Sequence, residues 1–195
     1  MNWFRQPLSL LPLVALLVAP ATAGTVTVTA VGDVMLAGSG APTYLAFGYD
    51  YPFAATNRWL QEGDLTVGNL EAPLTNGGEE FRDKRFRFRV ATKAADALQR
   101  AGFDVMTLAN NHMLDYGPTG LMDTLQQLQR VGISWAGAGI NLSKARKPAI
   151  VKVRDSRIAF LAYSLTFPTE FYATNHAPGT APGDAALVED DIRRA

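Results

Sequence analysis

Three short polar segments in this sequence carry side chains that could bind a metal ion. Each segment follows a run of β-forming residues, and these runs end at Val31, Val67 and Ala109. Carboxylate, amide and imidazole groups supply the oxygen and nitrogen donors that divalent Mg, Mn, Zn or Fe bind in proteins. The candidates are Asp33 after the first run, Asn69 and Glu71 after the second, and Asn110, Asn111, His112 and Asp115 after the third.

Each polar segment also has an ordinary explanation. Asp and Asn favour turns and helix caps on their own account, because their short side chains hydrogen-bond the nearby backbone. A lone histidine is usually a core or surface residue whose ring nitrogens have ordinary hydrogen-bond partners. A binding site is favoured because three separate segments carry such groups at the same point of the pattern, the end of a strand.

The residues between these polar segments alternate between strand-like and helix-like patterns. This alternation predicts an α/β fold with a mostly parallel sheet. Ligands of such sheets bind outside the carboxyl ends of the strands, which is where the three polar segments fall. Strands are predicted at residues 25–31, 65–67, 105–109 and 133–136, and helices at residues 52–61, 92–101 and 118–130.

The last part of the chain breaks this alternation. Residues 149–153 and 158–163 flank a polar turn and predict a β-hairpin. Residues 165–186 are rich in proline and glycine, which predicts a long loop. A further helix is expected over residues 187–195.

The composition excludes several classes of protein. The 195 residues include 18 Lys and Arg, 18 Asp and Glu and no cysteine, and 48% of them are hydrophobic. A net charge of zero argues against a nucleic-acid partner, because the phosphate backbone is met mainly by Lys and Arg. The lack of cysteine excludes a disulfide scaffold, a zinc–thiolate module and a cysteine nucleophile.

Residues 1–23 have the pattern of a secretory signal peptide. Arg5 precedes an apolar run over residues 8–18, which is too short to span a membrane. An Ala-Thr-Ala sequence ending at Ala23 matches a cleavage site. We therefore expect an exported protein, periplasmic or extracellular, whose mature domain comprises residues 24–195.

A basic and aromatic segment spans residues 84–90, with the sequence Lys-Arg-Phe-Arg-Phe-Arg-Val. Its period of two predicts a strand with Arg85, Arg87 and Arg89 on one face and the aromatic residues on the other. The basic face could bind a phosphate or a polyglutamate carboxylate. A half-buried strand with a solvated basic face is the favoured interpretation, because half-burial alone produces this alternation.

At the three polar segments the chain resembles the CapA family, the poly-γ-glutamate capsule biosynthesis proteins of the metallophosphatase superfamily. The resemblance covers residue 25 to the end of the chain and implies an α/β/β/α sandwich with two metal-binding loops in this half. The matching stretches are Val31-Gly-Asp-Val-Met35, Gly68-Asn-Leu-Glu-Ala-Pro73 and Ala101-Gly-Phe-Asp-Val-Met-Thr-Leu-Ala-Asn-Asn-His112 with Asp115-Tyr-Gly117.

The resemblance also implies roles for single residues. Asp33 matches the metal ligand of the first strand, Glu71 the bridging ligand and Asn111 a further ligand. His112 is then the proton donor or transition-state stabiliser, and Asp115 joins it as a candidate catalytic residue. Divalent metal ions at this position would lower the pKa of a bound water and stabilise charge at an attacked phosphoryl or acyl centre. Candidate substrate contacts are Asn69, Asn110, Arg85 and Arg87.

The sequence differs from the superfamily pattern in two ways that affect the expected metal ligands. Met35 stands where many metallophosphatases have a histidine, a difference that CapA proteins share. The family continues with histidine-bearing loops that do not occur before Ala195, and His176 matches neither of them. We therefore expect this chain to form the first part of the sandwich, with an incomplete set of metal ligands.

Three hypotheses about function follow. In the first, an exported CapA-like protein hydrolyses or transfers part of an extracellular anionic polymer, or its precursor, with the help of a metal ion. In the second, the protein is a non-catalytic scaffold or a polymer-binding subunit beside the membrane subunits of a capsule synthase. In the third, the chain is a truncated remnant. Metal content separates the first hypothesis from the second.

Overall fold

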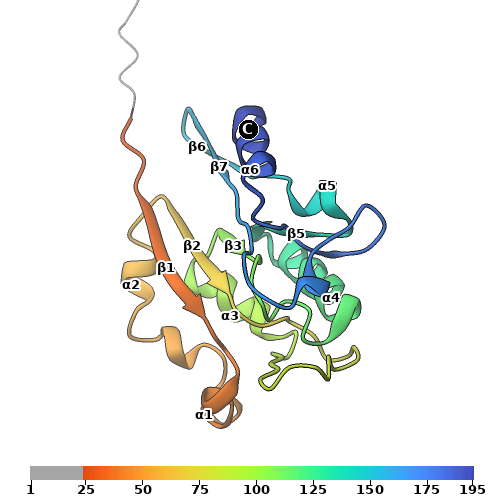
Figure 1. Cartoon of the computed structure of the whole chain (residues 1–195). Helices are drawn as coiled ribbons and strands as arrows, with labels where there is room; N and C mark the ends of the chain where they lie inside the picture. The colour runs from red at the N-terminus through yellow and green to blue at the C-terminus, as the bar shows by residue number, and fades with distance from the viewer. Residues whose placement is uncertain (1–23) are drawn as a thin grey trace, which may run out of the picture.

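The computed structural model describes residues 24–195, and the expected signal peptide at residues 1–23 lies outside them. At its centre is a four-stranded sheet in which every strand is parallel to its neighbours (Figure 1). The predicted α/β class with a parallel sheet is thus confirmed, and it is consistent with a metallophosphatase-like fold. The strand order is β1 (Val28–Val34), β2 (Leu65–Leu70), β3 (Val105–Thr107) and β4 (Ser134–Ala136).

Two amphipathic helices bury apolar residues in the core beside the sheet. α3 (Ala94–Ala101) and α4 (Gly117–Val131) lie close to the predicted helices, and each ends at a glycine with left-handed backbone geometry. Burial of one large apolar side chain contributes about 1.5–3 kcal/mol, so this core holds the sheet firmly beneath the polar turns. Its fully buried members include Leu70, Leu98, Met106, Leu121 and Leu128.

The first strand extends further than predicted, so that Asp33 lies within β1 rather than after it. The pairing of β1 with β2 changes register between Ala30 and Asp33. Such an irregularity is typical of a β-bulge, which re-aims a side chain near a functional site. The shift brings Asp33 level with Asn69 on the neighbouring strand.

The segment between β1 and β2 differs from the prediction of one helix over residues 52–61. The chain instead forms a 3-10 turn, η2 (Tyr51–Phe53), and the short helix α2 (Asn57–Leu60). Within residues 51–60, Phe53 and Leu60 are the large apolar residues that are buried. These two anchors lie seven residues apart, and two short turns bury both without a continuous helix.

The C-terminal part contains the predicted hairpin, formed by β6 (Ala149–Val153) and β7 (Ser156–Phe160). Within the predicted loop, β8 (Gly179–Thr180) pairs with β5 (Ala138–Gly139). A strand of two residues has no periodicity from which it could be predicted. The other elements are η1 (Gly38–Gly40), α1 (Ala41–Phe47), α5 (Leu142–Ala145), η3 (Thr169–Phe171) and α6 (Ala185–Arg194).

The predicted strand over residues 84–90 is wrong. The structure has a loop there, in which Val90 makes an isolated bridge. Phe86 was expected on the buried face but is 59% exposed, whereas the side chain of Lys84 is 12% exposed. Asp115, distant in sequence, holds this loop through Lys84 and a backbone amide. A local alternation cannot reveal such a contact.

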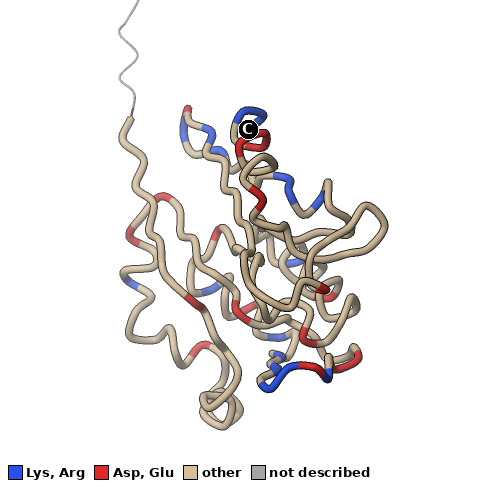
Figure 2. Tube along the Cα trace, in the orientation of Figure 1, with Lys and Arg blue, Asp and Glu red and all other residues tan. Residues whose placement is uncertain are grey.

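Many of the basic residues lie in two separate parts of the chain. Figure 2 shows one group along the loop before Val90 and another over the β6–β7 hairpin, α5 and α6. Acidic residues are interspersed with both groups. Among residues 24–195, every helix is too short or too polar to cross a membrane.

Candidate functional site

The carboxyl ends of the first three strands meet at one edge of the sheet, where the Asn69 side chain joins them. We call this edge the rim. It comprises Asp33, Asn69, Glu71, Thr107 and the turn at residues 110–115. In the strand pairing, Asn69 lies level with Asp33 on β1 and with Thr107 on β3. Its amide nitrogen donates to Asp33 Oδ1 at 2.8 Å and also to Glu71. Its oxygen accepts from Thr107 Oγ1 at 3.3 Å and from Asn110 Nδ2 at 3.0 Å. Two carboxylates and three strand ends therefore converge on a single amide.

Asn110 ties the turn after β3 to the end of β2. Its amide nitrogen also donates to the backbone oxygen of Leu70 at 2.8 Å, and its oxygen accepts from the backbone nitrogen of His112 at 3.0 Å. Asn69 and Asn110 thus use both of their amide atoms on protein partners. This arrangement favours a positioning role for the two residues over the substrate contacts predicted for them.

His112 and Asp115 form a buried pair in the turn that leads into α4. His112 is 8% exposed, and Asp115 is inaccessible to solvent. Imidazole Nδ1 lies 2.6 Å from Asp115 Oδ2, which also accepts a hydrogen bond from the backbone nitrogen of Phe88 at 2.8 Å. The Phe88 ring packs on the imidazole with 4.7 Å between centroids. With Nδ1 engaged by Asp115, Nε2 is the ring nitrogen left for acid–base chemistry.

Lys84, which is not among the site residues predicted from the sequence, lies at the same pair. Its ammonium group contacts Asp115 Oδ1 and the backbone oxygen of Asn111, and it lies 3.2 Å from His112 Nδ1. One signal in the sequence could have found it. With a period of two, Lys84 shares the even-numbered positions with the aromatic residues, which the pattern assigns to the interior.

The carboxyl groups of Asp33 and Glu71 suit a cation that is bound by oxygen ligands. Partial burial raises the pKa of the Glu71 carboxyl, and the Asp33 carboxylate raises it further, while the hydrogen bond from Asn69 lowers it. Two neighbouring carboxylates repel each other, and a divalent ion would relieve that repulsion. Among residues 24–195, no three His, Cys, Asp or Glu side chains form a group that could hold a metal ion. The donors predicted from the sequence are the carboxylates of Asp33 and Glu71 and the amide oxygen of Asn111.

Asn111 is the predicted source of that amide oxygen. It is partly exposed and directly precedes His112 in the turn after β3. Lys84 holds its backbone oxygen. The turn is therefore fixed through the main chain of Asn111, and its side chain remains the predicted ligand.

The two arginines predicted as substrate contacts do not share a strand face. Arg87 pairs with Glu80 at 2.8 Å and also donates to the backbone oxygen of Lys84. The exposed Arg85 lies over the ring of Phe86, 5.1 Å from its centroid. The structure therefore uses Arg87 to shape the loop and leaves Arg85 on the surface.

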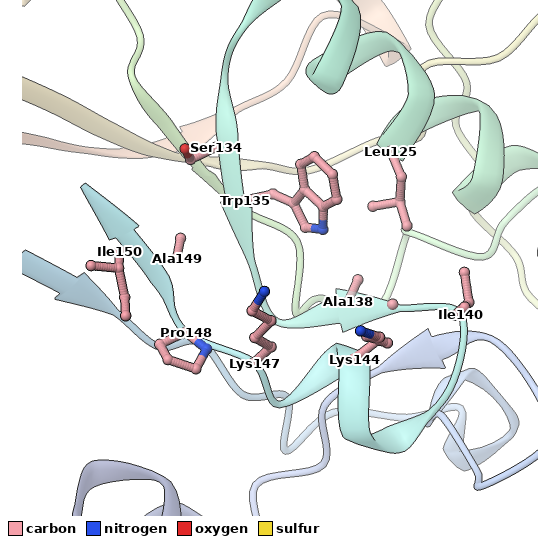
Figure 3. Close-up of a pocket in the computed structure, with 11 residues that line it drawn as sticks. Leu125, Ser134, Trp135, Ala138, Ile140, Lys144, Lys147, Pro148, Ala149 and Ile150 are labelled. Carbon is pink, nitrogen blue, oxygen red and sulfur yellow. The ribbon is translucent and has the colours of Figure 1, made fainter. Parts of the chain in front are cut away.

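A pocket lies away from the polar rim, beside the start of β4 and the strand β6. Its volume is about 390 Å³, and its lining includes Leu125, Trp135 and Ile150 together with Lys144 and Lys147 (Figure 3). None of the predicted site residues lines it. The pocket and the rim are therefore distinct features.

The match to a family model places this chain among known proteins. Residues 27–195 match the model described as bacterial capsule synthesis protein, so the chain belongs to that family. This confirms the resemblance stated from the three polar segments. The match includes the whole of the four-stranded sheet and every residue of the rim.

Individual relatives agree with the family. The chain is 30% identical over 172 residues to the capsule biosynthesis protein CapA of Bacillus anthracis, covering 87% of this chain and 42% of the relative. It is 29% identical over 167 residues to the PGA biosynthesis protein CapA of Bacillus subtilis, covering 85% and 44%. A probable polyglutamine synthesis accessory protein of Mycobacterium tuberculosis is 36% identical over 135 residues, covering 67% and 34%. The chain thus spans less than half the length of these relatives.

Proposed function

We propose that this protein acts outside the cytoplasm in the synthesis or handling of a polyglutamate capsule or a similar anionic polymer, with a metal-assisted site at the rim. The family and the names of the relatives support the polymer class. One geometric observation carries the site. Asp33 and Glu71 come together on a shared Asn69 donor, beside the turn that holds Asn111 and His112.

In this proposal Asp33, Glu71 and Asn111 hold a divalent ion through oxygen atoms. When bound, such an ion lowers the pKa of a coordinated water and stabilises the charge that develops at an attacked acyl or phosphoryl centre. Asn69 orients the two carboxylates. His112 gives or takes a proton at Nε2 while Asp115 holds Nδ1.

Metal binding tests the proposal directly. Titration of the purified, metal-free protein with Mn²⁺, Zn²⁺, Fe²⁺ or Mg²⁺ in a calorimeter should show saturable binding of at least one of these ions. Asp33→Asn, Glu71→Gln and Asn111→Ala should each weaken this binding at least tenfold. Glu62→Gln is the matched control, because Glu62 is an exposed carboxylate outside the rim.

Two outcomes would contradict the site. One is a wild-type protein that is folded by circular dichroism but binds none of the four ions. The other is equal binding by the rim variants and by Glu62→Gln. In either case the non-catalytic scaffold is the remaining function, and retention of labelled poly-γ-glutamate by the immobilised protein measures it.

A further inference from the structure

We propose that the pocket beside β4 and β6 is a binding site for an amphiphilic anion, a small molecule whose apolar body enters the pocket and whose carboxylate or phosphate group meets Lys144 and Lys147. The pocket has a volume of about 390 Å³. Small-molecule sites in proteins have volumes of about 300–1,000 Å³. Because none of the rim residues lines this pocket, the inference does not depend on the proposed function.

The walls of the pocket are mainly apolar and come from three elements. Leu125 lies on α4, Trp135 on β4 and Ile150 on β6 (Figure 3). Ile150 is 42% exposed, and Ile140, which also lines the pocket, is 49% exposed. A ligand with an apolar body would remove this aliphatic surface from water, which favours binding.

Two lysine ammonium groups supply positive charge at the same opening (Figure 3). Lys144 and Lys147 are both exposed, and no ion pair within residues 24–195 includes either of them. Arg146 lies between them in the sequence, but its guanidinium group pairs with Asp191 at 2.7 Å and with Asp190 at 3.2 Å. Among the described residues, the pocket lining contains no Asp or Glu. An anion at this opening would therefore meet two cations and no competing carboxylate of the lining.

The backbone that carries Lys144 is fixed by the fold. The Asn141 side chain caps α5 by accepting a hydrogen bond from the backbone nitrogen of Lys144 at 3.0 Å. The helix packs so closely on β5 that a Cβ added to Gly139 would lie 2.5 Å from the backbone nitrogen of Ala145. The start of the Lys144 side chain is therefore held beside the apolar walls.

The lining favours an amphiphilic anion over a chain of glutamates. A glutamate polymer carries a charge on every residue, and each charge that leaves water needs a partner. The pocket offers two lysines beside a larger number of apolar side chains. The charged group of an amphiphile can stay at the open edge with the exposed lysines, while its apolar body displaces water from the walls.

An NMR titration of the full chain measures binding at the pocket. The indole N–H signal of Trp135, identified with Trp135→Phe, should shift saturably with octanoate or with octyl phosphate, and the tighter ligand identifies the preferred anionic group. Octanol, which has no charge, should bind about threefold more weakly than octanoate, and octylammonium, which has the opposite charge, about tenfold more weakly. Added salt should weaken the binding of octanoate more than that of octanol, because salt screens exposed charges.

Three results of this titration would overturn the inference. The first is a Trp135 signal that neither octanoate nor octyl phosphate shifts. The second is equal binding of octanoate and octylammonium, which would reduce the site to an apolar surface. The third is tighter binding of a glutamate hexamer than of either octyl anion, which would assign the pocket to the polymer instead.

Variants at the exposed lysines isolate the charge. Lys144→Gln and Lys147→Gln should each weaken octanoate binding about threefold, and the double variant about tenfold. Lys152→Gln is the matched control, because it removes an exposed charge of β6 outside the lining and should leave the affinity unchanged. Unchanged affinity in a double variant that is folded by circular dichroism would refute the role of the lysines.

A second pair of variants isolates the apolar wall. Ile150→Ser should weaken octanoate binding about threefold, because part of the apolar contact is lost. Ile192→Ser is its control, since Ile192 lies on α6 outside the lining and is 62% exposed. Equal affinities of these two variants and the wild type would show that the octyl chain binds elsewhere and would overturn the inference.

Discussion

Asp33 and Glu71 accept hydrogen bonds from the same amide nitrogen, that of Asn69, where β1 meets β2. The amide uses both of its N–H groups on these two carboxylates, and its oxygen is held by Thr107 and Asn110. The orientation of the Asn69 side chain is therefore determined by four partners. A substitution at Asn69 therefore changes the hydrogen bonds of both carboxylates at once.

Asn69→Asp should place a third carboxylate at this point and remove both donors. The free energy of unfolding should fall by about 2–4 kcal/mol in chelator, because two carboxylates lose a hydrogen bond and gain a like charge. Millimolar Mn²⁺ or Mg²⁺ should restore part of the loss if the rim binds a cation. Urea unfolding with and without metal measures both effects. Asn175→Asp, at an exposed position, is the control and should change stability little.

Glu71 predicts a dependence of stability on pH. Burial and the neighbouring Asp33 raise the pKa of the Glu71 carboxyl above its ordinary value in the folded protein. The folded state therefore binds this proton more tightly than the unfolded state. The stability that the protonated Glu71 carboxyl contributes is fully present below its ordinary pKa. This stability is lost as the pH rises through the raised pKa of the folded state.

Glu71→Gln should accordingly unfold at a higher urea concentration than the wild type at pH 7 in chelator. The difference between the two proteins should shrink as the pH falls toward 4, where the wild-type carboxyl is mostly protonated in both states. Glu62→Gln should show no such trend. Equal stability of Glu71→Gln and wild type at both pH values would contradict the raised pKa.

Asp191 anchors α6 to the body of the domain. Its carboxylate receives two hydrogen bonds from Arg146, at 2.7 and 2.9 Å, and one from the Tyr163 hydroxyl at 2.9 Å. Burial and this hydrogen bond raise the pKa of Tyr163 to about 12. The stability that Tyr163 contributes through this shift is present below about pH 10, the ordinary tyrosine pKa, and is lost as the pH rises to about 12.

Asp191→Asn should lower the pKa of Tyr163 toward 10, which ultraviolet titration against Tyr163→Phe measures. It should also cost about 2–3 kcal/mol of stability, less than the roughly 3–5 kcal/mol of a fully buried pair, because Arg146 keeps some solvent contact. The control Glu189→Gln breaks an exposed ion pair with Arg193 and should cost under about 0.5 kcal/mol. Equal costs for the two variants would show that Asp191 is not the anchor.

Gly137 combines a left-handed backbone with close neighbours. Its φ is +90°, and an added Cβ would lie 2.7 Å from Ala109 Cβ and 2.8 Å from Ala162 Cβ. Gly137→Ala should therefore destabilise the protein by about 2–4 kcal/mol, from backbone strain and overpacking together. Gly132→Ala is the matched control: φ is +78° with no atom within 4 Å, so it should cost about 1 kcal/mol. Thermal or urea unfolding compares the two variants.

The parallel sheet and the polar rim were predictable because each depends on short-range patterns. β2 and β3 are rich in β-forming residues, with Asn69 near the end of β2 and Asn110 shortly after β3, and the glycines after α3 and α4 mark the helix ends. Parallel strands bring their carboxyl ends to one edge, so the rim followed from the topology.

The rest depends on contacts between residues that are far apart in the sequence. The alternation of residues 84–90 predicts a strand as well as any true strand does, yet the loop contacts Asp115 instead. The same contact brings Lys84 to His112. The period of two groups Lys84 with the residues expected in the interior, but it does not indicate which residue Lys84 contacts. The two-residue strand β8 was missed for a related reason, since it exists only through its pairing with β5.

Asp115 fixes the loop at residues 81–88, which packs against His112. Phe81, Lys84 and Phe88 are joined to Asp115 across 27 to 34 positions of chain, and none of them belongs to a helix or strand. Opening of this loop alone would release His112 from Phe88 and Asp115 from Lys84, while the four strands stay paired. Such an opening would change the surroundings of His112 without unfolding the sheet, because the contacts of the loop with Asp115 take no part in the strand pairing.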